Sequence, residues 1–86
     1  MEKLRFLDIE DLYLLIHLSE GLQVSQVASK MHVTQPAISQ RLMKINGGLG
    51  FRVHIVSKGV VVITDKGKLL AEAAKSCIEI LEKSIC

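Results

Sequence analysis

The chain's only proline, Pro36, stands two residues after Thr34, at the start of a stretch with helical periodicity. A proline inside a helix removes a hydrogen bond, but in the first turn its missing N–H has no intrahelical partner to lose. Because Thr34 is a good N-cap, we expect a helix that runs to about Asn46, where Gly47-Gly48 stops it. Pro36 therefore starts this helix rather than breaking it.

The helix expected over residues 34–46 has one apolar and one polar face. Ile38, Leu42 and Ile45 recur at i, i+4 and i+7 and form a buried stripe. The residues that point away from this stripe are Pro36, Ser39, Gln40, Met43 and Lys44. Nothing in the pattern explains the exposed Met43.

Two helices are expected before it. The first opens at the N-cap Asp8 and ends before Gly21, and its predicted buried stripe is Ile9, Leu12, Tyr13 and Ile16. The second runs from its cap Ser25 to Met31 and buries Val27, Ala28 and Met31. It has barely two turns, so it requires packing against its neighbours. His32-Val33 makes the tight connection to Thr34.

A hairpin and a long helix are expected after it. Val-rich runs at 52–56 and 60–63, joined by Ser57-Lys58-Gly59, are typical of a hairpin. Thr64-Asp65 then caps a helix to about Lys83, whose apolar stripe consists of Leu70, Ala74, Cys77, Ile78 and Leu81.

This order of elements predicts a mainly α winged helix-turn-helix, a three-helix core plus a β-hairpin wing, followed by a long C-terminal helix. We divide the chain into residues 1–64, the winged helix-turn-helix, and residues 65–86, a linker or dimerisation helix. A core built from 86 residues supplies little surplus stability, so a second copy of the chain would help.

Charge is unevenly distributed along the chain. Between Gly21 and Thr64 there is no Asp or Glu, and the five cations there are Lys30, Arg41, Lys44, Arg52 and Lys58. Such a localised positive field attracts a polyanion, and carboxylates on the same surface would be repelled by phosphates.

The outward face of residues 34–46 has the chemistry to read DNA. Gln35 and Gln40 each offer a donor and an acceptor, the combination that suits adenine. Arg41 or Lys44 could reach guanine or phosphate, while Ser39 and Thr34 could bond either a base or a phosphate oxygen. The alternative is an ordinary amphipathic helix with a solvated polar face.

The segments "VASKMHVTQPAISQRLMKI", "LGFRV" and "ITDKG" resemble the N-terminal DNA-binding domain of LysR-type transcriptional regulators. The resemblance implies base or groove contacts from Gln35, Pro36 and Ser39, to which the residue chemistry adds Gln40. It implies phosphate contacts from Ser25, Gln26, Thr34, Arg41 and Lys44, and backbone or minor-groove contacts from a wing with Arg52, Ser57 and Lys58. It further implies a homodimer through Leu70, Ala74, Cys77, Ile78 and Leu81, bound to a partly palindromic double-stranded site.

Some positions depart from the family pattern. The wing usually has Leu-Phe-x-Arg, where this chain has Val53, His54, Ile55 and Val56, and Met43 occupies a customarily basic position. Fewer cations imply a shallower salt dependence of DNA binding. His54 is either a partly packed histidine or a pH sensor.

Other properties follow by elimination. Cys77 and Cys86 lie about 900° apart on a helix, so they are expected to be free thiols, and no metal or cofactor is expected. No apolar run could span a bilayer, which favours a soluble, intracellular protein. The family resemblance implies a bacterial cytoplasmic protein that joins the nucleoid when bound to DNA. Family members carry a larger effector-binding domain after this helix, and any small-molecule effector would bind there. An end at Cys86 favours an excised domain over a natural short protein.

Three functions are compared. The first is sequence-specific DNA binding by a dimer. The second is a protein-interaction module whose apolar wing (Val53, Ile55, Val56 and residues 60–62) pairs with another regulator and binds DNA weakly. An enzyme has the least support, because the sequence has no nucleophile–base set and no phosphate-binding loop.

Overall fold

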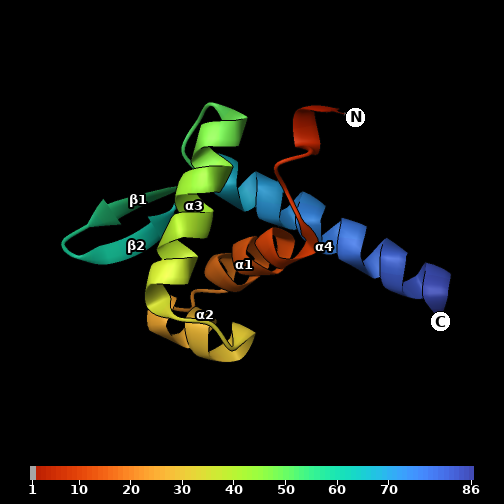
Figure 1. The fold of residues 1–86 in the computed structure, drawn as a ribbon, viewed down its shortest axis with the longest axis horizontal. Coiled ribbons are helices and arrows are strands. Elements are labelled where there is room, and N and C mark those ends of the chain that lie inside the picture. Colours follow the sequence, from red (N-terminus) through yellow and green to blue (C-terminus); the bar gives the residue numbers. More distant parts are fainter. Residues whose placement is uncertain (1) are drawn as a thin grey trace.

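The computed structural model describes the backbone of residues 2–86 and the side chains of residues 3–86. Within that range a short 3-10 helix, η1 (Glu2–Leu4), precedes four α-helices and a two-stranded hairpin. These are α1 (Ile9–Ser19), α2 (Val24–Met31), α3 (Gln35–Leu49), β1 (His54–Ser57), β2 (Val60–Ile63) and α4 (Asp65–Ile85). The predicted winged helix-turn-helix with a long C-terminal helix is confirmed (Figure 1).

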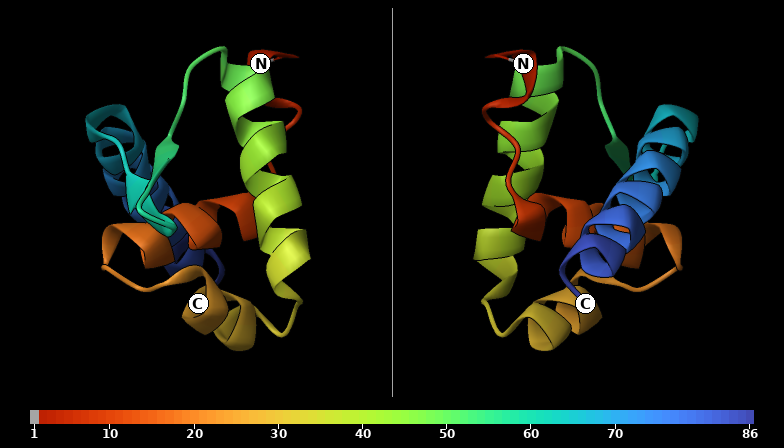
Figure 2. Two further views of the ribbon diagram at one scale, coloured as in Figure 1. Left: turned by 90° about the vertical axis from the view of Figure 1, so that its left-hand side faces the viewer. Right: turned by 90° about the vertical axis from the view of Figure 1, so that its right-hand side faces the viewer.

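Helix α1 crosses the middle of the molecule, with α3 on one side and α4 on the other (Figures 1 and 2). The wing, residues 54–63, extends at the opposite end of the molecule from the C-terminal end of α4 (Figure 1). All three helices of the predicted core contribute to one buried cluster, together with Val53 and α4. Its members are Leu14, Leu15, Leu18, Val27, Ala28, Ile38, Leu42, Ile45, Val53 and Ala71.

The cap of α1 is confirmed, but its predicted buried stripe is wrong. Asp8 caps the helix, whereas Ile9 is exposed and Leu12, Tyr13 and Ile16 are half-buried. The buried residues are Asp11, Leu14, Leu15 and Leu18. Because α1 lies between α3 and α4, it has two covered sides. Ile9, Leu12 and Tyr13 of the predicted stripe instead line grooves beside α4.

Helix α2 begins one residue earlier than expected, with Gln23 rather than Ser25 as its N-cap. The Gln26 Oε1 atom accepts a hydrogen bond from the Gln23 N–H at 2.8 Å. Val27 and Ala28 are buried as predicted, and Met31 is half-buried. The capping function thus comes from an amide side chain rather than from the serine hydroxyl.

Helix α3 starts at the Thr34 cap as predicted but does not end at Gly47-Gly48. It continues to Leu49 and ends at Gly50, whose φ of 77° is the left-handed conformation that favours glycine. A Cβ on Gly48 would overlap the Phe6 ring. The absence of a side chain at Gly48 therefore lets an aromatic side chain from the N-terminal segment lie against α3.

The wing is a tight antiparallel hairpin in which His54 pairs with Ile63 and Ser57 with Val60. Its turn is Lys58-Gly59, and both residues have positive φ, as in a two-residue hairpin loop. Strand β1 starts at His54, two residues later than predicted, and the preceding Val53 is fully buried.

Helix α4 begins at the predicted Thr64 cap and reaches Ile85, beyond the expected end at Lys83. Its apolar stripe divides into two parts. Ala71, Ala74 and Ile78 are buried, and α4 packs against α1. Leu70 is half-buried, while Leu81 and both free cysteines are exposed. Two of the five residues predicted to form a dimer interface, Ala74 and Ile78, are therefore covered within one chain.

Candidate nucleic-acid interface

The first two turns of α3 present a polar surface to solvent. The Thr34 Oγ1 atom accepts a hydrogen bond from the Ala37 N–H at 3.3 Å, and Pro36 occupies the first turn. This start of the helix brings together the four residues predicted to contact bases, all of them exposed: Gln35, Pro36, Ser39 and Gln40. The buried Ile38, Leu42 and Ile45 hold the opposite face against the core, as predicted. DNA contact by the four exposed residues stays a prediction.

The connection between α2 and α3 is short and well bonded. His32 has a left-handed conformation with φ 57°, and the Val33 N–H donates to the Ala28 carbonyl at 3.0 Å. This turn joins the end of α2 to the start of α3, and Ser25 and Gln26 are exposed in the first turn of α2. The helix-turn-helix thus places neutral donors on both helices, a suitable arrangement for phosphate oxygens.

The two cations of α3 are bound to acids from outside the carboxylate-free stretch. Arg41 Nη1 lies 3.1 Å from Asp8 Oδ1 and 3.0 Å from Asp11 Oδ1. Lys44 Nζ lies 3.7 Å from Asp8 Oδ2 and 2.5 Å from Asp11 Oδ2. We call these four residues the ion cluster. Sequence reasoning missed it, although the i, i+3 spacing of the acids matches that of the cations.

The ion cluster changes the electrostatics of the predicted surface. Burial raises the pKa of Asp8, but the Asp11 N–H and the charges of Lys44 and Arg41 outweigh it and hold the pKa below its usual 3.8. The hydrogen bond to Asp11 raises the pKa of Arg41. Two of the five cations between Gly21 and Thr64 are therefore paired, so the positive field inferred from the sequence is weaker than expected.

Lys58 and Arg52 supply the positive charge of the wing region. Lys58 lies in the exposed turn and Arg52 is exposed just before β1, with Ser57 exposed beside the turn. Most of the remaining wing surface is apolar: Ile55, Val56, Val60 and Val62 are exposed. Val53 is 0% exposed and Val61 is half-buried, so neither belongs to an interaction surface as the sequence had suggested.

Asn46 joins α3 to the base of the wing. Its Oδ1 atom accepts a hydrogen bond from the Val53 N–H at 2.8 Å, and its Nδ2 atom lies 3.2 Å from His54 Nδ1. His54 is half-buried, as expected for a packed histidine, and burial followed by the charge of Arg52 lowers its pKa below 6.5. The Asn46 amide can donate only to an unprotonated Nδ1, so a hydrogen bond between them favours neutral His54.

Met43 is 72% exposed and lies on the outward side of α3. It borders a hollow that is also lined by Asn46, Gly47, Gly50, Phe51 and Arg52. The hollow lies between the end of α3 and the base of the wing. Its position beside the predicted DNA surface places an apolar group where a cation would have met phosphate.

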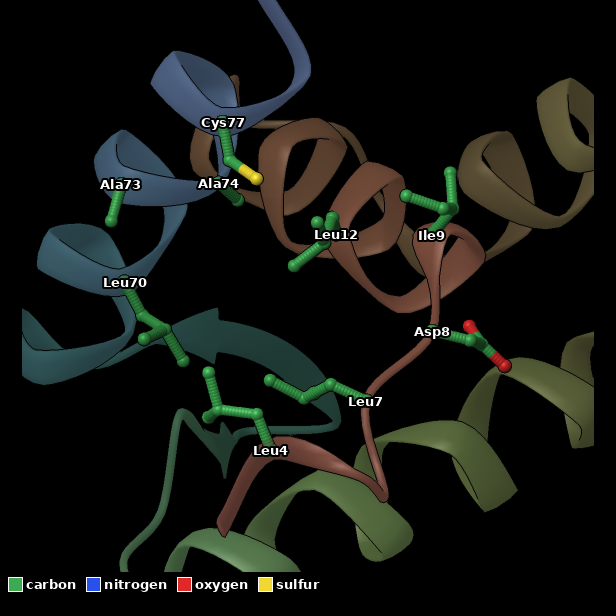
Figure 3. A pocket seen from close by; sticks show the side chains of 9 residues that line it. All are labelled: Leu4, Leu7, Asp8, Ile9, Leu12, Leu70, Ala73, Ala74 and Cys77. Carbon is green, nitrogen blue, oxygen red and sulfur yellow. The ribbon is translucent and has the colours of Figure 1, made fainter. Parts of the chain in front are cut away.

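An apolar groove of about 380 Å³ lies where the N-terminal segment and the start of α1 meet α4 (Figure 3). Leu4 and Leu7 point toward Leu70 across it, while the carboxylate of Asp8 turns away from these side chains (Figure 3). Ala74 and Cys77 also line the groove, and Leu81 and Ile78 line a second groove further along α4. The five residues predicted to form a dimer interface thus border two grooves, and two of them are buried within one chain.

No helix among residues 2–86 is long and apolar enough to cross a membrane. The described part of the chain also holds no cluster of three or more His, Cys, Asp or Glu that could bind a metal ion.

Comparison with known proteins agrees with this geometry. Residues 9–68 match the family model of bacterial regulatory helix-turn-helix proteins of the lysR family. The chain is 32% identical over 76 residues to the uncharacterized HTH-type transcriptional regulator YxjO of Bacillus subtilis, covering 88% of this chain and 26% of that protein. It therefore spans about a quarter of the length of this relative.

Two solved structures have a similar fold. Oxidized OxyR of Corynebacterium glutamicum has a TM-score of 0.80 and 27% identity, over 91% of this chain and 24% of that one. The CbnR_DBD–DNA complex has a TM-score of 0.81 and 23% identity, over 91% of this chain and 90% of that one. The chain belongs to the LysR family of bacterial regulatory helix-turn-helix proteins, and its winged helix-turn-helix is a DNA-binding module of transcription regulation.

Proposed function

We propose that α3 enters the major groove and reads a specific operator, with Gln35, Pro36, Ser39 and Gln40 at the base edges. The observation that carries this proposal is the exposed, carboxylate-free start of α3, fixed by the Thr34 cap and by three buried aliphatic residues. Side-chain amides and hydroxyls at the front of such a helix can pair with adenine and with phosphate. The CbnR_DBD–DNA complex, whose fold is similar to that of this chain, agrees with this use of the fold.

Phosphate contacts would come from both sides of the recognition helix. We assign them to Ser25, Gln26 and Thr34 on the helix-turn-helix, and to Arg52, Ser57 and Lys58 in and beside the wing. All six residues are exposed. Arg52 and Lys58 are the only charged residues of this set. Neutral donors would therefore make much of the contact with the DNA backbone.

We further propose a homodimer in which α4 pairs two chains, so that two α3 helices reach successive major grooves of a partly palindromic site. The exposed side chains of α4 that support this are Leu69, Cys77, Ile80, Leu81 and Ile85. An apolar surface of this kind on so small a domain favours burial against a second copy. Such a dimer would act in the bacterial cytoplasm, where the chromosome lies.

Selection of bound duplexes from a random pool, followed by titration of the selected site, tests DNA reading. Gln35→Ala and Ser39→Ala should each weaken the selected site by about 1 to 3 kcal/mol and relax the base preference at one position. Ser76→Ala, on the exposed side of α4, is the matched control for Ser39→Ala and should leave affinity unchanged. Equal loss on selected and scrambled duplexes would count against base reading by these residues.

A second function, a protein-interaction module, has one observation in its favour: the wing exposes Ile55, Val56, Val60 and Val62. Basic side chains are what a wing needs to meet phosphates, whereas apolar ones favour a protein partner. Sedimentation with and without duplex DNA at low salt separates the two functions. A dimer that is indifferent to DNA would support the interaction module.

A further inference from the structure

The ion cluster brings together two pairs of residues with the same spacing. Asp8 and Asp11 are three residues apart at the start of α1, and Arg41 and Lys44 are three residues apart on α3. Each carboxylate lies within 4 Å of both cations. Arg41 Nη1 also lies 3.3 Å from the second oxygen of Asp8. The cluster therefore connects the recognition helix to α1 at two successive turns.

Hydrogen bonds at the start of α1 hold the two acids in place independently of the cations. The Asp11 N–H donates to Asp8 Oδ1 at 2.9 Å, and the Asp8 N–H donates to Asp11 Oδ2 at 3.1 Å. This reciprocal capping box holds both carboxylates at the positive end of the α1 dipole. Because their positions are set by α1, the cations of α3 must align with them.

Asp11 cannot easily release its partners. Its side chain is 0% exposed, so an unpaired Asp11 carboxylate would be a buried, uncompensated charge. A DNA phosphate would meet Arg41 or Lys44 in a hydrated groove, where salt screens the attraction. The buried carboxylate is screened much less and competes well for the same cations.

We propose that Asp8 and Asp11 withhold Arg41 and Lys44 from DNA phosphates and act as positioning residues for the recognition helix. This inference rests on the proposed function. It replaces the assignment of these two cations to phosphate with an internal role. The face that α3 offers to DNA then reads bases with neutral groups, while sequence-independent attraction is held low. The acids thereby raise the ratio of specific to non-specific binding.

The salt dependence of DNA affinity distinguishes this role from direct phosphate contact. Each cation that contacts a phosphate adds about 0.9 to the slope of log K against log salt. Arg41→Gln should therefore leave the slope unchanged. Lys58→Gln, in the exposed wing turn, is the reference for a free cation and should lower the slope by about 0.9.

Removing an acid of the ion cluster should make the salt dependence of DNA binding steeper, whereas Lys58→Gln makes it shallower. Asp11→Asn should release one cation, steepen the slope by about 0.9 and strengthen binding to a scrambled duplex about eightfold at 0.1 M salt. Glu10→Gln is the matched control, because Glu10 is an exposed acid of the same helical turn and lies outside the ion cluster. It should produce a clearly smaller change than Asp11→Asn.

The measurement is fluorescence anisotropy of the full chain with the selected and the scrambled duplex, between about 50 and 200 mM salt. Circular dichroism first establishes that each variant is folded. If Asp11→Asn does not fold, Asp8→Asn replaces it, because Asp8 is exposed and its loss leaves Asp11 paired. A slope that falls by about 0.9 in Arg41→Gln, as in Lys58→Gln, would overturn the proposal. If the wild-type chain binds neither duplex, the proposed function itself fails, and this inference fails with it.

Discussion

The recognition helix and the wing carry positive charge in opposite ways. On α3, the cations are paired with carboxylates of α1, and the exposed surface is polar and neutral. In the wing, Lys58 is exposed in the turn, and the surface around it is apolar. A count of charges along the sequence treats these cations alike. Their surroundings separate a structural use of charge from one available to a ligand.

The largest difference between the two regions should appear in stability. Asp11→Ala removes the buried partner of Arg41 and Lys44 and one carboxylate of the capping box, so we expect a loss of about 2 to 4 kcal/mol. Lys58→Ala in the wing turn should change stability by less than about 0.5 kcal/mol. Urea unfolding followed by circular dichroism measures both. Equal effects would show that the ion cluster does not stabilise the contact between α1 and α3.

Asn46 connects the two regions, so its substitution tests how much that connection contributes to stability. Asn46→Ala removes the acceptor for the Val53 N–H, which belongs to a buried residue, and should cost about 1 to 3 kcal/mol. The same unfolding experiment on Gln40→Ala, an exposed position of the same helix, should show a change within about 0.5 kcal/mol. If both variants unfold at the same urea concentration, Asn46 does not hold the wing to α3.

Substitution at the start of α3 should reduce the free energy of unfolding more than substitution at the end of β1. Thr34→Ala removes the cap from the Ala37 N–H and should cost about 1 kcal/mol, and Thr34→Ser should recover most of it. Ser57→Ala, at the exposed end of β1, serves as the comparison and should be close to neutral. Thermal unfolding of the three variants gives the order, and a Thr34→Ser variant as unstable as Thr34→Ala would contradict capping by the hydroxyl.

The smallest effect should be a pH dependence that is confined to the wing. Burial and the charge of Arg52 lower the pKa of His54 below 6.5, so the unfolded chain takes up a proton before the folded chain does. The stability contributed by neutral His54 is complete above pH about 6.5 and declines as the pH falls. Asp8, whose pKa lies below 3.8, stays ionised in this range.

Urea unfolding at pH about 7.5 and 5.5 therefore measures the contribution of His54 to the pH dependence of stability. The wild type should lose more stability on acidification than His54→Asn, which keeps a polar side chain but cannot titrate. His17 and His32 are present in both proteins and cancel in the difference. Identical losses in the two proteins would assign the pH dependence to those other groups.

Local signals were sufficient to predict most elements of the fold. Three caps, Asp8, Thr34 and Thr64, were identified from residue type and position, and each accepts the expected backbone hydrogen bond. The buried stripe of α3 follows from periodicity because only one side of that helix faces the core. These features depend on neighbours within a few residues, which the sequence makes visible.

Features that depend on distant contacts were missed. The segment "IEDLYLLIHLS" is apolar on several sides, so periodicity alone could not choose the face of α1 that two other helices cover. The Phe6 ring lies against Gly48 in the last turn of α3, a contact between residues some forty positions apart. The ion cluster likewise pairs residues about thirty positions apart. Matched i, i+3 spacing of acids and cations was the one sequence signal that could have suggested it.

The N-terminal segment has a wider reach than its length suggests. Phe6 lies against Gly48 at the end of α3, Leu4 and Leu7 line the groove beside α4, and Asp8 binds the cations of α3. Four of the five residues from position 4 to position 8 thus contact α3 or line the groove beside α4. Displacement of this segment would therefore remove contacts that hold the recognition helix in its orientation, at a site remote from the bases it reads.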